Sequence, residues 1–119
     1  MRQFFTAGFA GLALACPAAA QPPAPVENDL KCVAALLAIA GSMPEGAQRM
    51  QMAAGVMYFM GRVEGQAPTL DLKAELQRIV PTLGSSQIEE EARRCGAILI
   101  EKGGRLQDIG KALGQPEAQ

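Results

Sequence analysis

The amino-acid sequence predicts an all-α protein, a compact bundle of about five short helices stapled by one disulfide. Three observations carry this prediction. Apolar residues recur at helical spacing through most of the chain, no segment alternates apolar and polar residues as a strand would, and two cysteines lie far apart in one small domain. A chain of 119 residues has room for one hydrophobic core.

Residues 1–20 have the pattern of a cleaved secretory signal peptide. Arg2 supplies a positive charge, residues 4–15 form an apolar run, and Ala18 and Ala20 bracket a small-residue cleavage pattern. The run is shorter than the ~20 apolar residues that a transmembrane helix needs. We therefore expect cleavage between Ala20 and Gln21, and a periplasmic or secreted protein.

The three cysteines have different expected roles. Cys16 lies within the predicted signal peptide, and because Pro17 follows it directly, it matches a bacterial lipoprotein box poorly. Lipidation of Cys16 is therefore not expected. Cys32 and Cys95 remain after cleavage, and an even cysteine count in a small exported chain predicts a disulfide. Because that bridge would close a long loop, its chain-entropy contribution to stability is ~4 kcal/mol.

Residues 21–27 form a Pro-rich leader that we expect to be extended. The helical domain follows over residues 28–114, and residues 115–119 are predicted to be a flexible tail. The first helix begins near Asn28 or Asp29, either of which caps a helix well, and ends at Gly41. Its residues are apolar nearly all round, which predicts a central helix covered by the others.

The second and third helices have recognisable ends. Ser42 and Glu45 fit a capping box that opens the second helix, which should end near Gly65. The third helix is predicted over residues 71–80, where Pro81 ends it.

The last two helices are predicted from a second capping box and a pair of glycines. Ser86 and Glu89 open the fourth helix, and the apolar spacing places Cys95 on its buried face. Gly103 and Gly104 are predicted to end this helix. A short fifth helix over residues 105–113 then carries its apolar residues on one side: Leu106, Ile109 and Leu113.

Four methionines lie in the second helix, and at 100° per residue they divide between two faces. Met50, Met57 and Met60 share one face. Met52 lies on the other with aliphatic and aromatic neighbours: Val56, Phe59 and Val63. Two apolar faces predict a helix sandwiched between others, so glycines within it, Gly55 and Gly61, are interpreted as positions of close packing.

Three uses of the Met50, Met57 and Met60 face remain open. Methionine fills irregular gaps in cores, which predicts a buried face. Methionine-rich faces also bind varied proteins, which predicts a client- or partner-contact face, hidden at rest and exposed by a trigger. A minor alternative is Cu(I) binding, which thioethers favour, although histidine, a usual companion ligand, is absent from the chain.

The composition argues against several functional classes. Because the chain contains no histidine, it has no nucleophile–histidine pair, and it has no phosphate-binding glycine loop. We therefore expect no enzyme activity, no cofactor and no metal site. Arg2 is one of 11 Lys and Arg residues, so the exported chain keeps no basic excess over 12 Asp and Glu residues. Nucleic acid is not an expected partner, and no transmembrane segment is expected after cleavage.

Three segments carry a resemblance to a known family: KCVAALLA around Cys32, MYFMGR at the end of the second helix, and ARRCGAIL around Cys95. With the predicted signal and helices, this layout resembles the small acid-stress chaperones of the HdeA/HdeB type. The resemblance implies a periplasmic protein that is a folded homodimer at neutral pH. In strong acid such a protein partly unfolds and holds aggregation-prone clients.

Small periplasmic immunity proteins share a similar plan of helices and one disulfide. A specific-partner protein, such as an immunity protein or an envelope-complex subunit, is therefore the alternative. Both hypotheses predict a protein that acts through protein–protein contacts.

Overall fold

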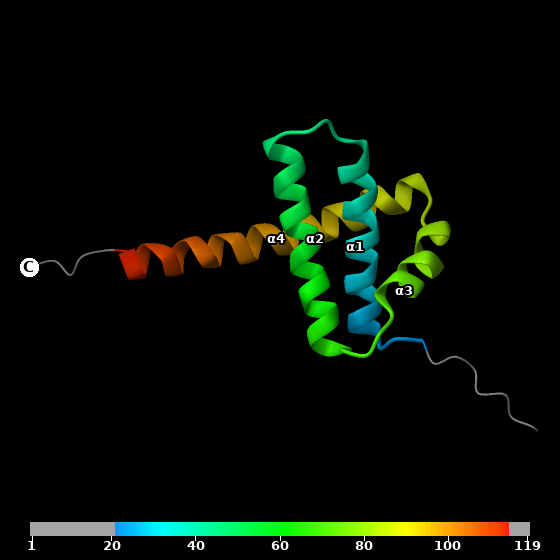
Figure 1. Ribbon diagram of the computed structural model, residues 1–119. Coiled ribbons are helices and arrows are strands. Elements are labelled where there is room, and N and C mark those ends of the chain that lie inside the picture. Colours follow the sequence, from blue (N-terminus) through cyan, green and yellow to red (C-terminus); the bar gives the residue numbers. More distant parts are fainter. Residues whose placement is uncertain (1–20, 115–119) are drawn as a thin grey trace, which may run out of the picture.

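The structure, a computed structural model, describes residues 21–114. The predicted signal peptide, Cys16 and the predicted tail lie outside the described residues. Within residues 21–114 the chain forms four α-helices, one 3₁₀ turn and no strand (Figure 1). The helices are α1 (Ala24–Ser42), α2 (Ala47–Gln66), α3 (Leu72–Ile79) and α4 (Ser85–Gly114), and the turn is η1 (Val80–Thr82). The all-α prediction is confirmed, with four helices in place of five.

Helix α1 lies at the centre of the bundle and contacts each of the other three helices. Figure 1 shows α1 and α2 side by side, α3 along the opposite side of α1, and α4 crossing the pair. Its almost continuous apolar surface explains this position, because a helix that is apolar all round must be covered. The prediction of a central first helix is confirmed.

Helix α1 begins earlier than predicted, at Ala24. Pro23 precedes the helix and Pro25 lies in its first turn, where a missing N–H removes no helical hydrogen bond. The prediction of an extended leader is therefore wrong for residues 24–27. Asp29 does not cap the helix but lies inside it, almost completely buried.

The predicted capping box at Ser42 and Glu45 is wrong. Ser42 ends α1 instead, because its hydroxyl donates to the carbonyl of Ile39 at 2.8 Å. Helix α2 begins at Ala47, after Gly46, whose φ of 152° is a conformation that side-chain-bearing residues rarely adopt. A serine hydroxyl can bond to either of two helices, and sequence spacing alone does not decide between them.

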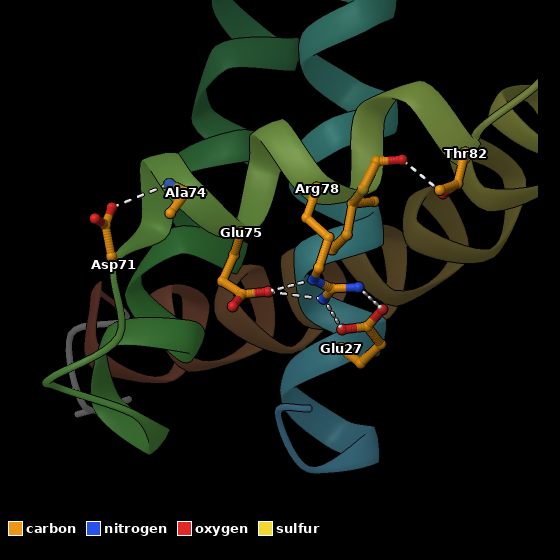
Figure 2. A network of polar contacts seen from close by, with 7 residues as sticks. Glu27, Asp71, Ala74, Glu75, Arg78 and Thr82 are labelled. Atoms are coloured by element: carbon orange, nitrogen blue, oxygen red, sulfur yellow. Dashed lines mark hydrogen bonds and ion pairs between the residues drawn. The ribbon is translucent and has the colours of Figure 1, made fainter. Parts of the chain in front are cut away.

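Helix α3 follows its prediction closely. The Asp71 carboxylate accepts a hydrogen bond from the backbone N–H of Ala74 at 3.0 Å, which caps the helix (Figure 2). Pro81 lies in η1, where the Thr82 hydroxyl donates to the carbonyl of Ile79 at 2.6 Å. The 3₁₀ turn thus continues α3 by one tight turn before the chain enters α4.

Helix α4 begins at Ser85, so Ser86 lies inside it and the predicted capping box at Ser86 and Glu89 is wrong. The side chain of Gln87 reaches back and accepts from the N–H of Gly84 at 2.9 Å, ahead of a helix that begins at Ser85. The helix then runs through Gly103 and Gly104 without a break, so the separate fifth helix is wrong. Glycine ends a helix where it adopts positive φ, and among the described residues only Gly46 does so.

The core consists of two apolar clusters along α1. The first surrounds the disulfide between Cys32 and Cys95, whose Cα atoms are 5.6 Å apart. The disulfide prediction is confirmed, and so is the burial of Cys95. The second lies toward the start of α1 and under α3: Val26, Leu30, Ala34, Val63 and Ile79.

Only one of the two glycines interpreted as packing positions has that role. A Cβ on Gly55 would lie 2.7 Å from Cδ1 of Leu99, so its absence lets α4 cross α2 closely. A Cβ on Gly61 would have no atom within 4 Å. The interpretation is confirmed for Gly55 and wrong for Gly61.

Candidate functional site

The methionines of α2 lie on two faces, as predicted. The face that contains Met52 is buried, and the face that contains Met50 and Met57 is not. Val56, Phe59 and Val63 are buried in the core, and Met52 packs against them half-buried. Met50 is 75% exposed and Met57 is 72% exposed. The expectation of a buried, sandwiched helix is therefore wrong for this side of α2, because no neighbouring helix covers it within residues 21–114.

Met60 has a different environment from Met50 and Met57, the other two methionines of the predicted contact face. It is half-buried and packs against the cluster that contains the disulfide. A helical wheel gives the angle of a residue but not the width of the neighbouring helix, which explains this difference. The exposed part of the predicted face therefore consists of Met50 and Met57.

Two adjoining hollows flank these methionines. One, of about 340 Å³, lies between α1 and α2 beside Leu37 and Met57. The other, of about 350 Å³, lies at the start of α2 beside Met50. Arg49 and Ala53 line both hollows. We call Leu37, Arg49, Met50, Ala53 and Met57 together the methionine face.

The methionine face combines apolar side chains with one cation. Leu37 is 46% exposed, and the small side chain of Ala53 leaves room between the two methionines. Thioether side chains change shape at low cost, so such a face accommodates apolar groups of different outline. Arg49, which lines both hollows, adds hydrogen-bond donors to the face.

A separate groove, of about 490 Å³, lies on another side of the molecule between α1, α2 and α4. Met43, Met52, Leu99 and Ile100 supply its apolar lining, and Gln51 is among its polar residues. A third hollow, of about 570 Å³, lies along α3 and η1 beside Leu72, Leu76, Val80 and Pro81. The sequence indicated the apolar spacing of α3 but not that part of this face would remain uncovered.

An ion pair between α1 and α2 lies at the edge of the core. Nε of Arg62 lies 3.1 Å from Oδ2 of Asp29, and Nε2 of Gln66 donates to the same oxygen at 3.1 Å. The guanidinium also lies over the rings of Tyr58 and Phe59, 5.7 and 5.8 Å from their centroids. This arrangement fixes the guanidinium between a carboxylate and two aromatic faces.

A second ion pair joins α3 to α1. The Arg78 guanidinium contacts Glu27 at 2.6 Å and Glu75 at 2.7 Å, and Figure 2 shows both carboxylates converging on it. Hydrogen bonds to Glu27, the larger effect, and to Glu75 raise the pKa of Arg78 above its ordinary value. The guanidinium therefore keeps its positive charge in this contact.

Arg94 joins α4 to α1 near the disulfide. It pairs with Glu91 at 2.6 Å and donates to the carbonyl of Asn28 at 2.8 Å. The sequence does not reveal the contact between Arg94 and Asn28, because residues far apart in the chain that meet across two helices leave no periodic pattern.

No group of three or more His, Cys, Asp and Glu residues is placed to hold a metal ion within residues 21–114. The hypothesis of Cu(I) binding by thioethers concerns other ligands and stays a prediction. In the same part of the chain, no helix has both the length and the apolar character needed to cross a membrane.

No protein-family model, no curated protein and no solved structure matches this chain.

Proposed function

We propose that this protein is exported and acts through contact with another protein at its methionine face. The observation that carries the proposal is the exposure of Met50 and Met57 in the folded chain, on either side of two hollows that share Arg49 and Ala53. Scattered exposed apolar residues are ordinary, whereas adjoining ones around a hollow are typical of interaction surfaces.

Two further features support the proposal. Methionine is over-used on protein-binding surfaces because its flexible side chain adapts to its partner. The disulfide between Cys32 and Cys95 supports export, since such bridges persist in oxidising compartments. Because the face is exposed at rest, its contact needs no trigger, which favours a specific partner at neutral pH.

Affinity capture with matched variants tests this proposal. The wild-type protein with its disulfide intact and the Met50→Glu/Met57→Glu variant serve as baits in periplasmic extract at neutral pH. Ile100→Glu is the control, because Ile100 is an exposed apolar residue that lines the separate groove between α1, α2 and α4 and not the methionine face. We expect one partner that the wild type and the control retain and the double variant loses. No stable partner, or equal retention by all three baits, would contradict the proposal.

An acid-stress holdase is the second candidate, and the ion pairs favour it. Glu27 joins α3 to α1 through Arg78, and Asp29 joins α2 to α1 through Arg62. Below about pH 3 most carboxylates are protonated, while Lys and Arg keep their charge. The exported chain would then carry about ten positive charges, and their repulsion favours opening.

The disulfide would limit that opening. It joins α1 to α4, whereas α3 is joined to α1 through the Arg78 contact and the apolar cluster beneath it. Release of α3 would uncover the cluster that contains Leu30 and Ile79, which are completely or almost completely buried at rest. An acid-exposed apolar cluster of this kind would hold unfolded clients.

Light scattering of an unrelated aggregating client at about pH 2–3 and at pH 7 tests the holdase candidate. We expect suppression of aggregation in acid alone. Glu27→Gln should shift the onset of suppression to higher pH, because it weakens the contact with Arg78, whereas Glu64→Gln, on the exposed side of α2, should leave the onset unchanged. Absence of suppression at every ratio of protein to client would rule out this candidate.

A further inference from the structure

The end of α4 carries an apolar stripe that no part of the described chain covers. After crossing α2, the helix continues well beyond the bundle (Figure 1). On this segment Leu106 is 70% exposed, Leu113 is 83% exposed and Ile109 is 46% exposed. We call residues 101–114 the C-terminal arm.

The stripe on the C-terminal arm continues the face that packs inside the bundle. Ile88, Ala92, Cys95 and Leu99 follow one another at alternating steps of four, three and four, and they are buried or half-buried. The same steps continue through Lys102, Leu106, Ile109 and Leu113. A seam of this period is the pattern by which one helix packs along another. The arm therefore has the apolar seam of a packed helix, but no helix among the described residues packs against it.

We propose that the C-terminal arm pairs in antiparallel fashion with the arm of a second copy of this chain, which makes the protein a homodimer. Around a two-fold axis between Gln107 and Asp108, Leu106 of each copy lies opposite Ile109 of the other. Leu113 lies opposite Lys102, whose methylene stem covers the leucine. Every seam position of the arm then has a partner, which is the self-complementarity that a two-fold interface requires.

The charges of the arm also match in this arrangement. The ammonium group of Lys102 lies close to the last turn of the opposite helix, where carbonyl groups without helical partners attract a cation. On one flank of the seam, Arg105 of each copy lies near Asp108 of the other. Arg105 and Asp108 thus place opposite charges beside the centre of the pair.

The other flank of the seam consists of glycines. Gly103 and Gly110 have no atom within 4 Å of the position that a Cβ would occupy. Glycine lowers the stability of an exposed helix, and no contact among residues 21–114 compensates for this loss at either position. In the pair, these positions let the two helices approach closely, as Gly55 already does where Leu99 crosses α2. A helix as short as the arm is marginal in water without packing, which the second copy supplies.

Analytical ultracentrifugation of the full chain with its disulfide intact, from about 1 μM to 1 mM, tests the proposal. We expect a reversible monomer–dimer equilibrium, because two arms form only a small interface. Leu106→Glu should raise the dissociation constant at least about tenfold. Gln107→Glu is the matched control, because it adds the same charge outside the seam and should leave the constant unchanged. Since Leu106 is exposed in the single chain, neither change should unfold the bundle, which circular dichroism checks.

A charge-swap experiment tests the antiparallel register. Arg105→Glu alone places two acidic groups near each other and should weaken the dimer, as should Asp108→Arg alone. The double variant Arg105→Glu/Asp108→Arg should restore dimerisation. A chain that stays monomeric throughout, a dimer that survives Leu106→Glu, or an arm that binds a different protein as a monomer would each overturn the proposal. These outcomes are independent of the methionine face, which lies on α1 and α2.

Discussion

Asp29, which is 2% exposed, has Oδ2 3.1 Å from Nε of Arg62 in the neighbouring helix. A buried carboxylate is stable only where other groups compensate for lost hydration. Here Arg62 and Gln66 both contact the same oxygen, and no buried side-chain polar atom among the described residues lacks a hydrogen-bond partner. The pair therefore fixes the position of α2 along α1.

The first prediction is that Asp29→Ala destabilises the protein by about 1–3 kcal/mol. The substitution removes the acceptor for Arg62 and Gln66 and leaves a small gap in the core. The loss stays below that of a fully buried pair because the Arg62 side chain is 37% exposed and can reach water. Urea unfolding measures the effect. Glu64→Ala, on the exposed side of α2, is the control and should change stability by less than about 0.5 kcal/mol.

This ion pair also illustrates what the sequence could not reveal. Burial follows the helical period, so the central position of α1 and the burial of Cys95 were predictable. The contact between Asp29 and Arg62 joins distant parts of the chain and has no period. Asp29 was instead interpreted as one of two possible caps, with Asn28 as the other, because both residue types are common at that position.

Errors at the helix ends have a related cause. Ser42 and Gly103 have local roles that depend on tertiary structure: the first ends α1 instead of opening α2, and the second continues α4 instead of ending it. The exposure of Met57 was missed for the same reason. The sequence shows which faces of a helix are apolar and could be buried. Which of them is buried depends on where the neighbouring helices lie.

The second prediction concerns the crossing of α2 and α4. Gly55→Val should destabilise the protein by about 1–3 kcal/mol, because its side chain meets Leu99 where even a Cβ would lie at 2.7 Å. Gly61→Val places the same side chain in the same helix, where a Cβ has no atom within 4 Å. It should change stability little or increase it, and thermal unfolding of both variants checks the contrast. Equal destabilisation would mean that the contact with Leu99 does not determine the effect, because valine favours a helix more than glycine does and helix propensity cannot destabilise either variant.

The third prediction separates the two faces of α2. Met57→Ala should change the free energy of unfolding by less than about 0.5 kcal/mol, because the side chain is 72% exposed. Phe59→Ala should cost about 3–5 kcal/mol, because Phe59 is completely buried beside the disulfide. Urea unfolding of both variants measures the difference. A large loss in Met57→Ala would show that this methionine is packed in solution and would remove the basis of the methionine face.

The last prediction concerns the disulfide. Replacement of Cys32 and Cys95 by serine should lower stability by about 2–5 kcal/mol, because the unfolded chain loses a constraint over a long loop. The loss includes any unfavourable burial of the two hydroxyl groups, since both cysteines are completely buried. A Cys32→Ala/Cys95→Ala variant separates this contribution, because alanine has no polar group to bury.

Thermal unfolding with and without a reductant provides the internal check. Reductant should lower the melting temperature of the wild type and leave both double variants unchanged, and a wild type that melts identically in both conditions would contradict the stabilising role of the bridge.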